Sequence, residues 1–210
     1  MPCRRNRWSR CLPTLRMDTE STDALDRQDM ARLAAGQDSA LNDLMNRHAQ
    51  RLFHYLIRQL RDESDAEDTA QETFVRVFQN SKKFDARYRF NTWLYTIATN
   101  LARTKQRWRT RHPQISLEAE NENTGGHLKE NLPATGATPE EKMIGGERAD
   151  AVRTAIAKLP EDLRTVILLF EYEGQSQQEI ARVLDCTAKA VEMRLYRARL
   201  QLRESLASLL

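Results

Sequence analysis

The spacing of apolar residues along the chain predicts helices and no strands. In residues 41–59 apolar positions recur at intervals of three and four, which is the period of one helix face. Shorter stripes with the same period occupy residues 66–78 and 94–101, and Asn91 is placed to cap the second of them. Residues 81–90 have no period and predict a loop. No segment alternates between apolar and polar positions, so we expect an all-α fold.

The C-terminal part predicts four helical segments, at about 140–158, 160–172, 176–184 and 187–207. The last two read as a helix-turn-helix, because small and apolar residues stand where two helices must cross around a short turn. Asp185 occupies the turn position that needs a left-handed backbone, and Thr187 is placed to cap the second helix. A purely structural helical hairpin would give the same local pattern.

Between the two helical parts, residues 113–145 contain three Pro and four Gly with few large apolar groups, so they predict a linker. Residues 1–16 are Arg-rich and have no helical period, and we expect a disordered basic tail or a chain that starts at Met17. The predicted architecture is therefore two small helical domains, residues 17–112 and 146–210, joined by a flexible acidic linker.

Charge is unevenly distributed along the sequence. Residues 17–75 carry a net charge of −7, residues 76–112 carry +9, and the linker carries −4, although the whole chain is only +3. Charge segregated in this way indicates different partners for different segments.

The few cysteines and histidines, and the short apolar runs, argue against disulfide-rich, metal-binding and membrane-spanning proteins. Cys3, Cys11 and Cys186 are too scattered for a disulfide framework or a zinc knuckle, and a reducing cytoplasm is the expected compartment. His48 and His54 are six residues apart, so on a helix they point in different directions, and we expect solvated or half-buried histidines. We expect no metal, no cofactor and no small-molecule substrate. We also expect no membrane span, because no apolar run approaches 18 residues.

The basic segment also concentrates aromatic residues, since half of the 14 aromatics lie in residues 76–112. Cations neutralise phosphates and aromatic faces stack on unpaired bases, so this mixture suits single-stranded nucleic acid. The alternative is that the aromatics form core. We favour the core for Phe78 and Trp93, and a nucleic-acid contact for Tyr88 and Phe90, which lie between cations.

The sequence resembles the extracytoplasmic-function (ECF) sigma factors of bacterial RNA polymerase. Three stretches carry the resemblance: Asp65–Val75 (DAEDTAQETFV), Phe90–Asn100 (FNTWLYTIATN), and Leu159–Arg199 with its helix-turn-helix. The resemblance implies promoter-specific initiation without catalysis, and three partners: core RNA polymerase, promoter DNA and an anti-sigma factor.

The resemblance also assigns residues to three sites. The side chains expected to dock on core polymerase are Asp65, Glu67, Asp68, Gln71 and Glu72. Those expected to open and hold the −10 element are Phe84, Arg87, Tyr88, Arg89, Phe90, Asn91, Trp93, Asn100, Arg103, Lys105 and Arg107. Those expected on the −35 duplex are Thr187, Lys189, Glu192, Met193, Arg194, Tyr196, Arg197 and Arg199, with Arg194 and Arg199 as phosphate contacts.

Two rival functions are weaker. A one-component helix-turn-helix regulator would need a ligand-binding or receiver domain upstream, and residues 24–111 show no α/β alternation. An enzyme acting on nucleic acid would need a metal-binding carboxylate cluster, a Gly-rich phosphate loop or a nucleophile–base pair, and none of these motifs occurs in the sequence.

Overall fold

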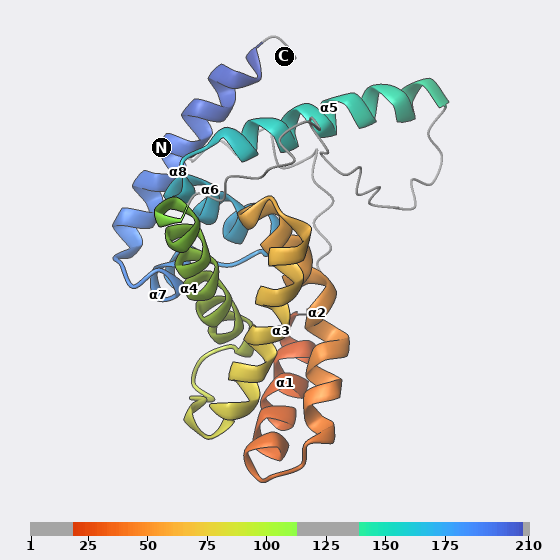
Figure 1. The fold of residues 1–210 in the computed structure, drawn as a ribbon, viewed down its shortest axis with the longest axis vertical. Helices are drawn as coiled ribbons and strands as arrows, with labels where there is room; N and C mark the ends of the chain where they lie inside the picture. Colours follow the sequence, from red (N-terminus) through yellow and green to blue (C-terminus); the bar gives the residue numbers. More distant parts are fainter. Residues whose placement is uncertain (1–18, 113–138, 208–210) are drawn as a thin grey trace.

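The computed structural model describes residues 19–112 and 139–207, and Figure 1 shows their arrangement. Within these ranges there is no β-strand, which confirms the all-α prediction. The helices are α1 (Thr19–Ala34), α2 (Ser39–Leu60), α3 (Glu63–Gln79), η2 (Ser81–Lys83), α4 (Phe90–Arg111), α5 (Pro139–Lys158), α6 (Glu161–Ile167), η3 (Leu168–Tyr172), α7 (Gln177–Val183) and α8 (Ala188–Ser205). The predicted tail and residues 113–138 of the predicted linker lie outside the described residues.

The long predicted helix is α2, and its end is set by backbone geometry. The face that recurs every three to four residues is buried, from Leu44 to Leu60. Arg61 then takes a left-handed conformation, with φ of 59°, which stops the helix. Asp62 follows as the N-cap of α3, and its carboxylate accepts a hydrogen bond from the Asp65 N–H at 2.8 Å. That hydrogen bond lowers the pKa of Asp62, so the cap is charged at neutral pH.

The start of α4 differs from the prediction. Arg89, not Asn91, is the residue before the helix, and no side chain caps it. Asn91 lies inside the first turn. Phe90 is fully buried, so packing of this ring against the core starts the helix before the residue that could cap it. Tertiary contact has here outweighed a local capping signal.

The helix-turn-helix has the predicted geometry. Asp185 in the turn has a positive φ of 49°, and the Thr187 hydroxyl accepts a hydrogen bond from the Ala190 N–H at 3.1 Å at the start of α8. At the start of α7, Ser176 and Glu179 form a reciprocal capping box. Both helices are therefore begun by side-chain caps that the local sequence supplies.

One segment of the predicted helix 160–172 is not α-helical. After α6 the backbone widens into the π-helical segment η3, where the Glu173 N–H donates to the Leu168 carbonyl at 3.2 Å. This wider turn brings Tyr172 and Glu173 against the N-terminal domain, where the guanidinium of Arg58 lies 4.4 Å from the centre of the Tyr172 ring.

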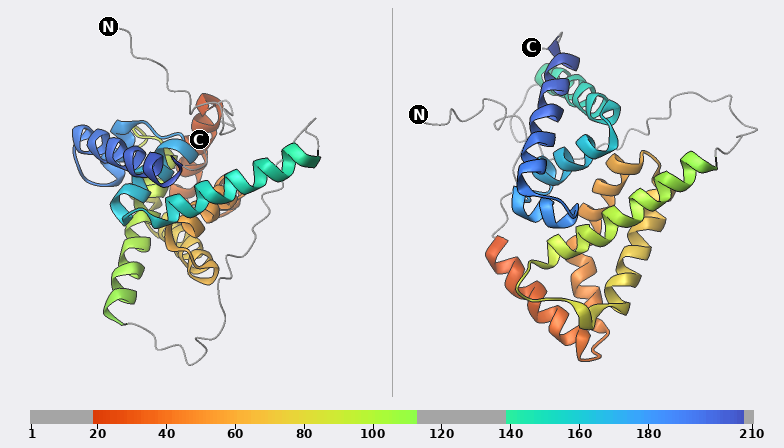
Figure 2. Two further views of the ribbon diagram at one scale, coloured as in Figure 1. Left: turned by 90° about the horizontal axis from the view of Figure 1, so that it is seen from above. Right: turned by 90° about the vertical axis from the view of Figure 1, so that its left-hand side faces the viewer.

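The two helical domains share one apolar core. Figure 1 and the second view in Figure 2 show α7 beside α4, with α6 close to the end of α2. The segment η3 also contacts α2. The buried cluster runs without a break from Met30 in α1 to Ala198 in α8. Across it the Gln59 amide donates to the Thr165 hydroxyl at 2.9 Å, and both side chains are fully buried. The sequence analysis did not predict that the domains pack on each other.

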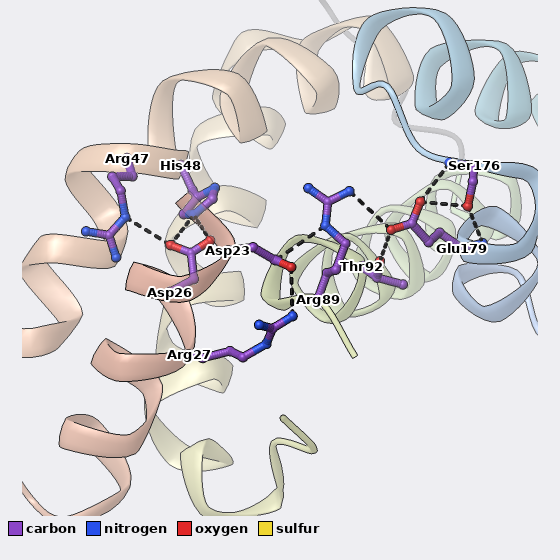
Figure 3. Close-up of polar contacts among 9 residues, drawn as sticks. All are labelled: Asp23, Asp26, Arg27, Arg47, His48, Arg89, Thr92, Ser176 and Glu179. Carbon is purple, nitrogen blue, oxygen red and sulfur yellow. Dashed lines mark hydrogen bonds and ion pairs between the residues drawn. The ribbon is translucent and has the colours of Figure 1, made fainter. Parts of the chain in front are cut away.

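A buried polar network ties α1 to α2, and Figure 3 shows it. The Asp26 carboxylate accepts from Arg47 at 2.9 Å and lies 2.8 Å from His48 Nε2. His48 is buried, so the expectation of a solvated or half-buried histidine is wrong for this residue. It is held by a carboxylate 22 positions earlier, which no local pattern indicates.

We expect Asp26→Ala to lower the free energy of unfolding by about 2–3 kcal/mol, because it leaves the buried His48 without its carboxylate partner and leaves Arg47 with Asp29 alone. Asp43→Ala is the matched control, since Asp43 is exposed and pairs with Arg32 at the surface; it should cost less than about 1 kcal/mol. Urea denaturation followed by circular dichroism measures both. Equal costs for the two variants would contradict a structural role for the Asp26 network.

Candidate nucleic-acid interface

The aromatic residues before and within α4 form a cluster. The rings of Phe84, Phe90 and Trp93 lie with centroids 5.4 to 6.3 Å apart. Phe90 is fully buried beneath the other two, so the prediction that its face is available to a base is wrong. Phe78 was predicted to be core and is instead 42% exposed. Phe78 lies on α3 and Phe90 begins α4, so the burial of each ring depends on how these helices pack, which the local sequence does not specify.

Tyr88 is the exposed ring of this region, as predicted. It is 40% exposed, and two guanidinium groups lie over it: Arg87 at 5.9 Å and Arg182 at 4.5 Å from its centroid. Arg182 comes from α7 of the C-terminal domain and was not among the predicted site residues. The ring is therefore already covered on one side by a cation from the other domain.

Most of the predicted −10 cations have protein partners. Arg87 pairs with Asp85, Arg89 pairs with Asp23 and Glu179 at 3.3 Å each, and Arg103 lies 3.8 Å from Glu161. Lys105 contacts Asp65 and Asp68 at 2.6 and 3.2 Å. Arg109, which was not in the predicted set, contacts Asp62 at 2.9 Å. Burial alone would lower the pKa of Lys105, but the bonds to the two carboxylates raise it.

The predicted −10 residues that remain exposed on α4 are Asn100 and Arg107. Trp108, which the sequence analysis did not place in the site, is half exposed and stacks on His112 with centroids 4.9 Å apart. Together these side chains give the C-terminal half of α4 a polar and aromatic outer face.

The five predicted polymerase-docking residues point to different sides of α3, so they do not form one patch. Asp65 and Asp68 face the basic side chains of α4, and Glu72 pairs with Arg76 at 2.8 Å. Glu67 and Gln71 face the other way, towards α2. There they border an apolar groove of about 350 Å³ whose remaining lining residues are Met45, Ala49, Phe53, Ala70 and Phe74.

The second helix of the helix-turn-helix exposes most of its predicted contact residues on one face. The exposed side chains are Lys189, Glu192, Met193, Tyr196 and Arg197. Thr187 serves as the N-cap, and the two expected phosphate contacts are engaged within the domain: Arg199 with Glu171 at 2.8 Å, and Arg194 with Asp162 at 3.9 Å. An exposed helix face of this kind fits the major groove of DNA.

Comparisons with known proteins decide the family. Residues 44–112 match the family model "Sigma-70 region 2", and residues 149–202 match "Sigma-70, region 4". The chain is 35% identical over 175 residues to the ECF RNA polymerase sigma factor SigW of Bacillus subtilis, covering 83% of this chain and 92% of SigW. The chain belongs to the ECF sigma factor family. It is thus a promoter-specific sigma factor of RNA polymerase.

Two further similarities agree with this assignment. The sigma factor is 32% identical over 192 residues to the RNA polymerase sigma-H factor of Pseudomonas aeruginosa, covering 90% of this chain and 97% of that one. Its fold is similar to CnrH, solved in complex with the cytosolic domain of CnrY, with a TM-score of 0.63 and 27% identity over 88% of this chain and 98% of CnrH.

The matched regions frame the candidate sites. The region 2 match begins within α2 and ends just after α4, so it contains both the α3 groove and the aromatic cluster. The region 4 match begins halfway along α5 and ends near the end of α8. Among residues 19–112 and 139–207, none of the helices combines the length and the apolar character that a membrane span requires.

Pairing of Asp65 with α4 has a consequence for mutagenesis of this sigma factor. We expect Asp65→Asn to lower the free energy of unfolding by about 1–2 kcal/mol, because it removes the least exposed of the three carboxylates that pair with Lys105 and Arg109. Asp68→Asn is the control, since Asp68 is 69% exposed and should cost less than about 0.5 kcal/mol. Thermal melts of both variants test this, and an unchanged Asp65→Asn protein would contradict it.

Proposed function

We propose that the two domains of this sigma factor divide promoter recognition between them. Residues 17–112 bind core RNA polymerase and the −10 element, and residues 146–210 bind the −35 duplex. The observation that carries this division is the exposed face of α8, where Lys189, Glu192 and Arg197 stand free of the domain core. Arg197 can bind the edge of a guanine, and Glu192 can accept from a cytosine.

The −10 strand is proposed to lie on the α4 side of the N-terminal domain. Tyr88 offers an exposed ring for stacking, and Asn100 and Arg107 offer exposed polar groups along α4. Phe84 and Trp93 lie beneath this surface, where their rings pack on each other and on the buried Phe90. The paired cations Arg89, Arg103 and Lys105 would exchange their carboxylate partners for phosphates.

Core polymerase is proposed to dock on the groove between α2 and α3. Glu67 and Gln71 supply polar contacts at its border, and its apolar lining includes the exposed Met45 and the partly buried Phe53. A groove of this size suits a helix with an apolar stripe and basic flanks. Asp65 and Asp68 contribute through the charge at the start of α3, because their carboxylates already hold α4.

Three further features of the proposed function follow from the relatives. CnrH is solved with the cytosolic domain of CnrY, and we propose that an anti-sigma factor likewise binds this chain. We also propose that the protein acts in the cytoplasm, and that it supplies no catalytic residue, since phosphodiester formation belongs to the polymerase.

The function is tested by run-off transcription with purified core polymerase on a pool of random promoter sequences. We expect specific start sites only when the sigma factor is present. Glu67→Lys with Gln71→Lys should lower core affinity at least about tenfold and reduce the transcript in proportion, because the reversal places cations at the docking groove. Glu63→Lys is the control, since Glu63 is exposed on the same helix but outside the groove. A one-component regulator would give no specific start with core polymerase alone.

The −35 assignment is tested with matched and scrambled duplexes drawn from the selected promoters. Arg197→Ala should cost about 1–3 kcal/mol on the matched duplex and relax specificity. Arg199→Ala should weaken both duplexes about equally and lower the salt dependence by about one counterion. Fluorescence anisotropy at several salt concentrations measures both. Identical profiles for the two variants would remove the distinction between base and phosphate contact.

A further inference from the structure

The exposed face of α8 has an apolar centre. Met193, Tyr196 and Leu200 recur at intervals of three and four residues and are 42%, 64% and 41% exposed. Each residue of a helix turns by about 100°, so Glu192 borders this apolar stripe on one side and Arg197 borders it on the other. The most outward part of α8 is therefore apolar, whereas the outward face of a helix in a soluble domain is normally polar.

The apolar stripe takes no part in the core of its own domain. The residues of α8 that reach the core are Val191, Leu195 and Ala198, with Leu202 partly buried beside them. Their spacing places them on the opposite side of the helix from the apolar stripe. Because the core does not use the three exposed side chains, they are available for contact with another molecule.

The charged groups beside the apolar stripe favour DNA as that molecule. Lys189 donates to both carboxylate oxygens of Glu192 at 2.9 Å each, so the acid at one border is already paired with a cation. At the other border, no carboxylate of the described residues forms an ion pair with Arg197. A molecule that meets this face must supply acceptors for Arg197 around an apolar surface. The major groove of a duplex does so.

The floor of the major groove carries one kind of apolar group, the C5 methyl group of thymine. A recognition helix reaches the base edges with its N-terminal residues. Met193 lies in the second turn of α8, whereas Leu200 lies in the fourth turn, about 10 Å further along the helix axis. Within the apolar stripe, Met193 is therefore placed to reach a base edge, and Leu200 lies beyond the groove.

We propose that Met193 selects a thymine in the −35 duplex by packing on its C5 methyl group, and that the ring of Tyr196 shields this contact from water. The thymine lies within about two base-pair steps of the guanine that Arg197 binds, because four helical residues advance by about 6 Å and one base pair by about 3.4 Å. The inference rests on the proposed function, since it takes α8 as the helix that enters the −35 groove. It adds the base that the apolar stripe selects.

The test removes the thymine methyl group alone. The full chain selects duplexes from a pool of random sequence, and each thymine near the contacted guanine is then replaced by deoxyuridine, which pairs in the same way but lacks the C5 methyl group. Met193→Ala removes the proposed contact from the protein. Leu200→Ala is the matched control, since Leu200 is as exposed as Met193 and lies on the same helix.

Fluorescence anisotropy measures the affinity of each protein for each duplex. We expect one deoxyuridine replacement to weaken binding of the wild-type chain about fourfold, which is the effect of burying one methyl group. Met193→Ala should bind the thymine duplex at least about fourfold more weakly and should respond to that replacement by less than about twofold. Leu200→Ala should respond as the wild-type chain does. Met193→Gln, which keeps the length of the side chain, repeats the test if circular dichroism shows that Met193→Ala is unfolded.

Several outcomes would overturn the inference. They are selected duplexes that lack a thymine near the guanine, a wild-type chain that responds to no replacement, and a Met193→Ala variant that responds as the wild-type chain does. A wild-type dimer that Met193→Ala dissociates, measured by light scattering, would assign the apolar stripe to self-association instead. Each of these leaves the proposed function intact if the run-off assay gives specific starts. Failure to select any duplex, together with no specific start, overturns both.

Discussion

Burial of Glu173 between two helical domains constrains the arrangement around it. A carboxyl group removed from water must be paired or neutralised, and burial raises the pKa of Glu173 accordingly. Its partners come from two helices of the other domain: the Tyr95 hydroxyl and, at 3.5 Å, the Arg51 guanidinium. The Tyr95 hydroxyl is buried with this carboxyl group, so satisfying Glu173 helps to fix the relative position of α4 and η3.

Opposite charges that are segregated along the sequence lie close together in the folded chain. Residues 17–75 and 76–112 carry opposite net charges, and the sequence analysis assigned them to separate partners. In the folded chain many of these charges face each other, as Lys105 does with Asp65. The residues proposed for docking and for DNA binding are therefore electrostatically coupled through the short distance between α3 and α4, so a substitution in one proposed site changes the potential at the other.

Local features of the fold were predictable from the sequence, and long-range ones were not. The caps at Asp62 and Thr187 and the left-handed Asp185 depend on residues within three positions of each other, so their identities are sufficient. The burial of His48 depends instead on a carboxylate 22 positions away. The exposure of Phe78 on α3 and the burial of Phe90 at the start of α4 depend on how these helices pack in the fold. The exposed face of α8 was predicted well because a helix-turn-helix defines its own buried side.

The π-helical turn of η3 makes the contact between domains sensitive to a change of a single residue. In an α-helix each residue advances by about 100°, whereas the hydrogen bond from the Glu173 N–H to Leu168 spans five residues. A deletion within Leu168–Tyr172 that restored the α-helical register would rotate the preceding helix relative to Tyr172 and Glu173 by about that angle. The length of this short segment therefore sets the angle at which Tyr172 and Glu173 leave the helix. A change of one residue there would prevent the two domains from packing, even if each domain kept its own fold.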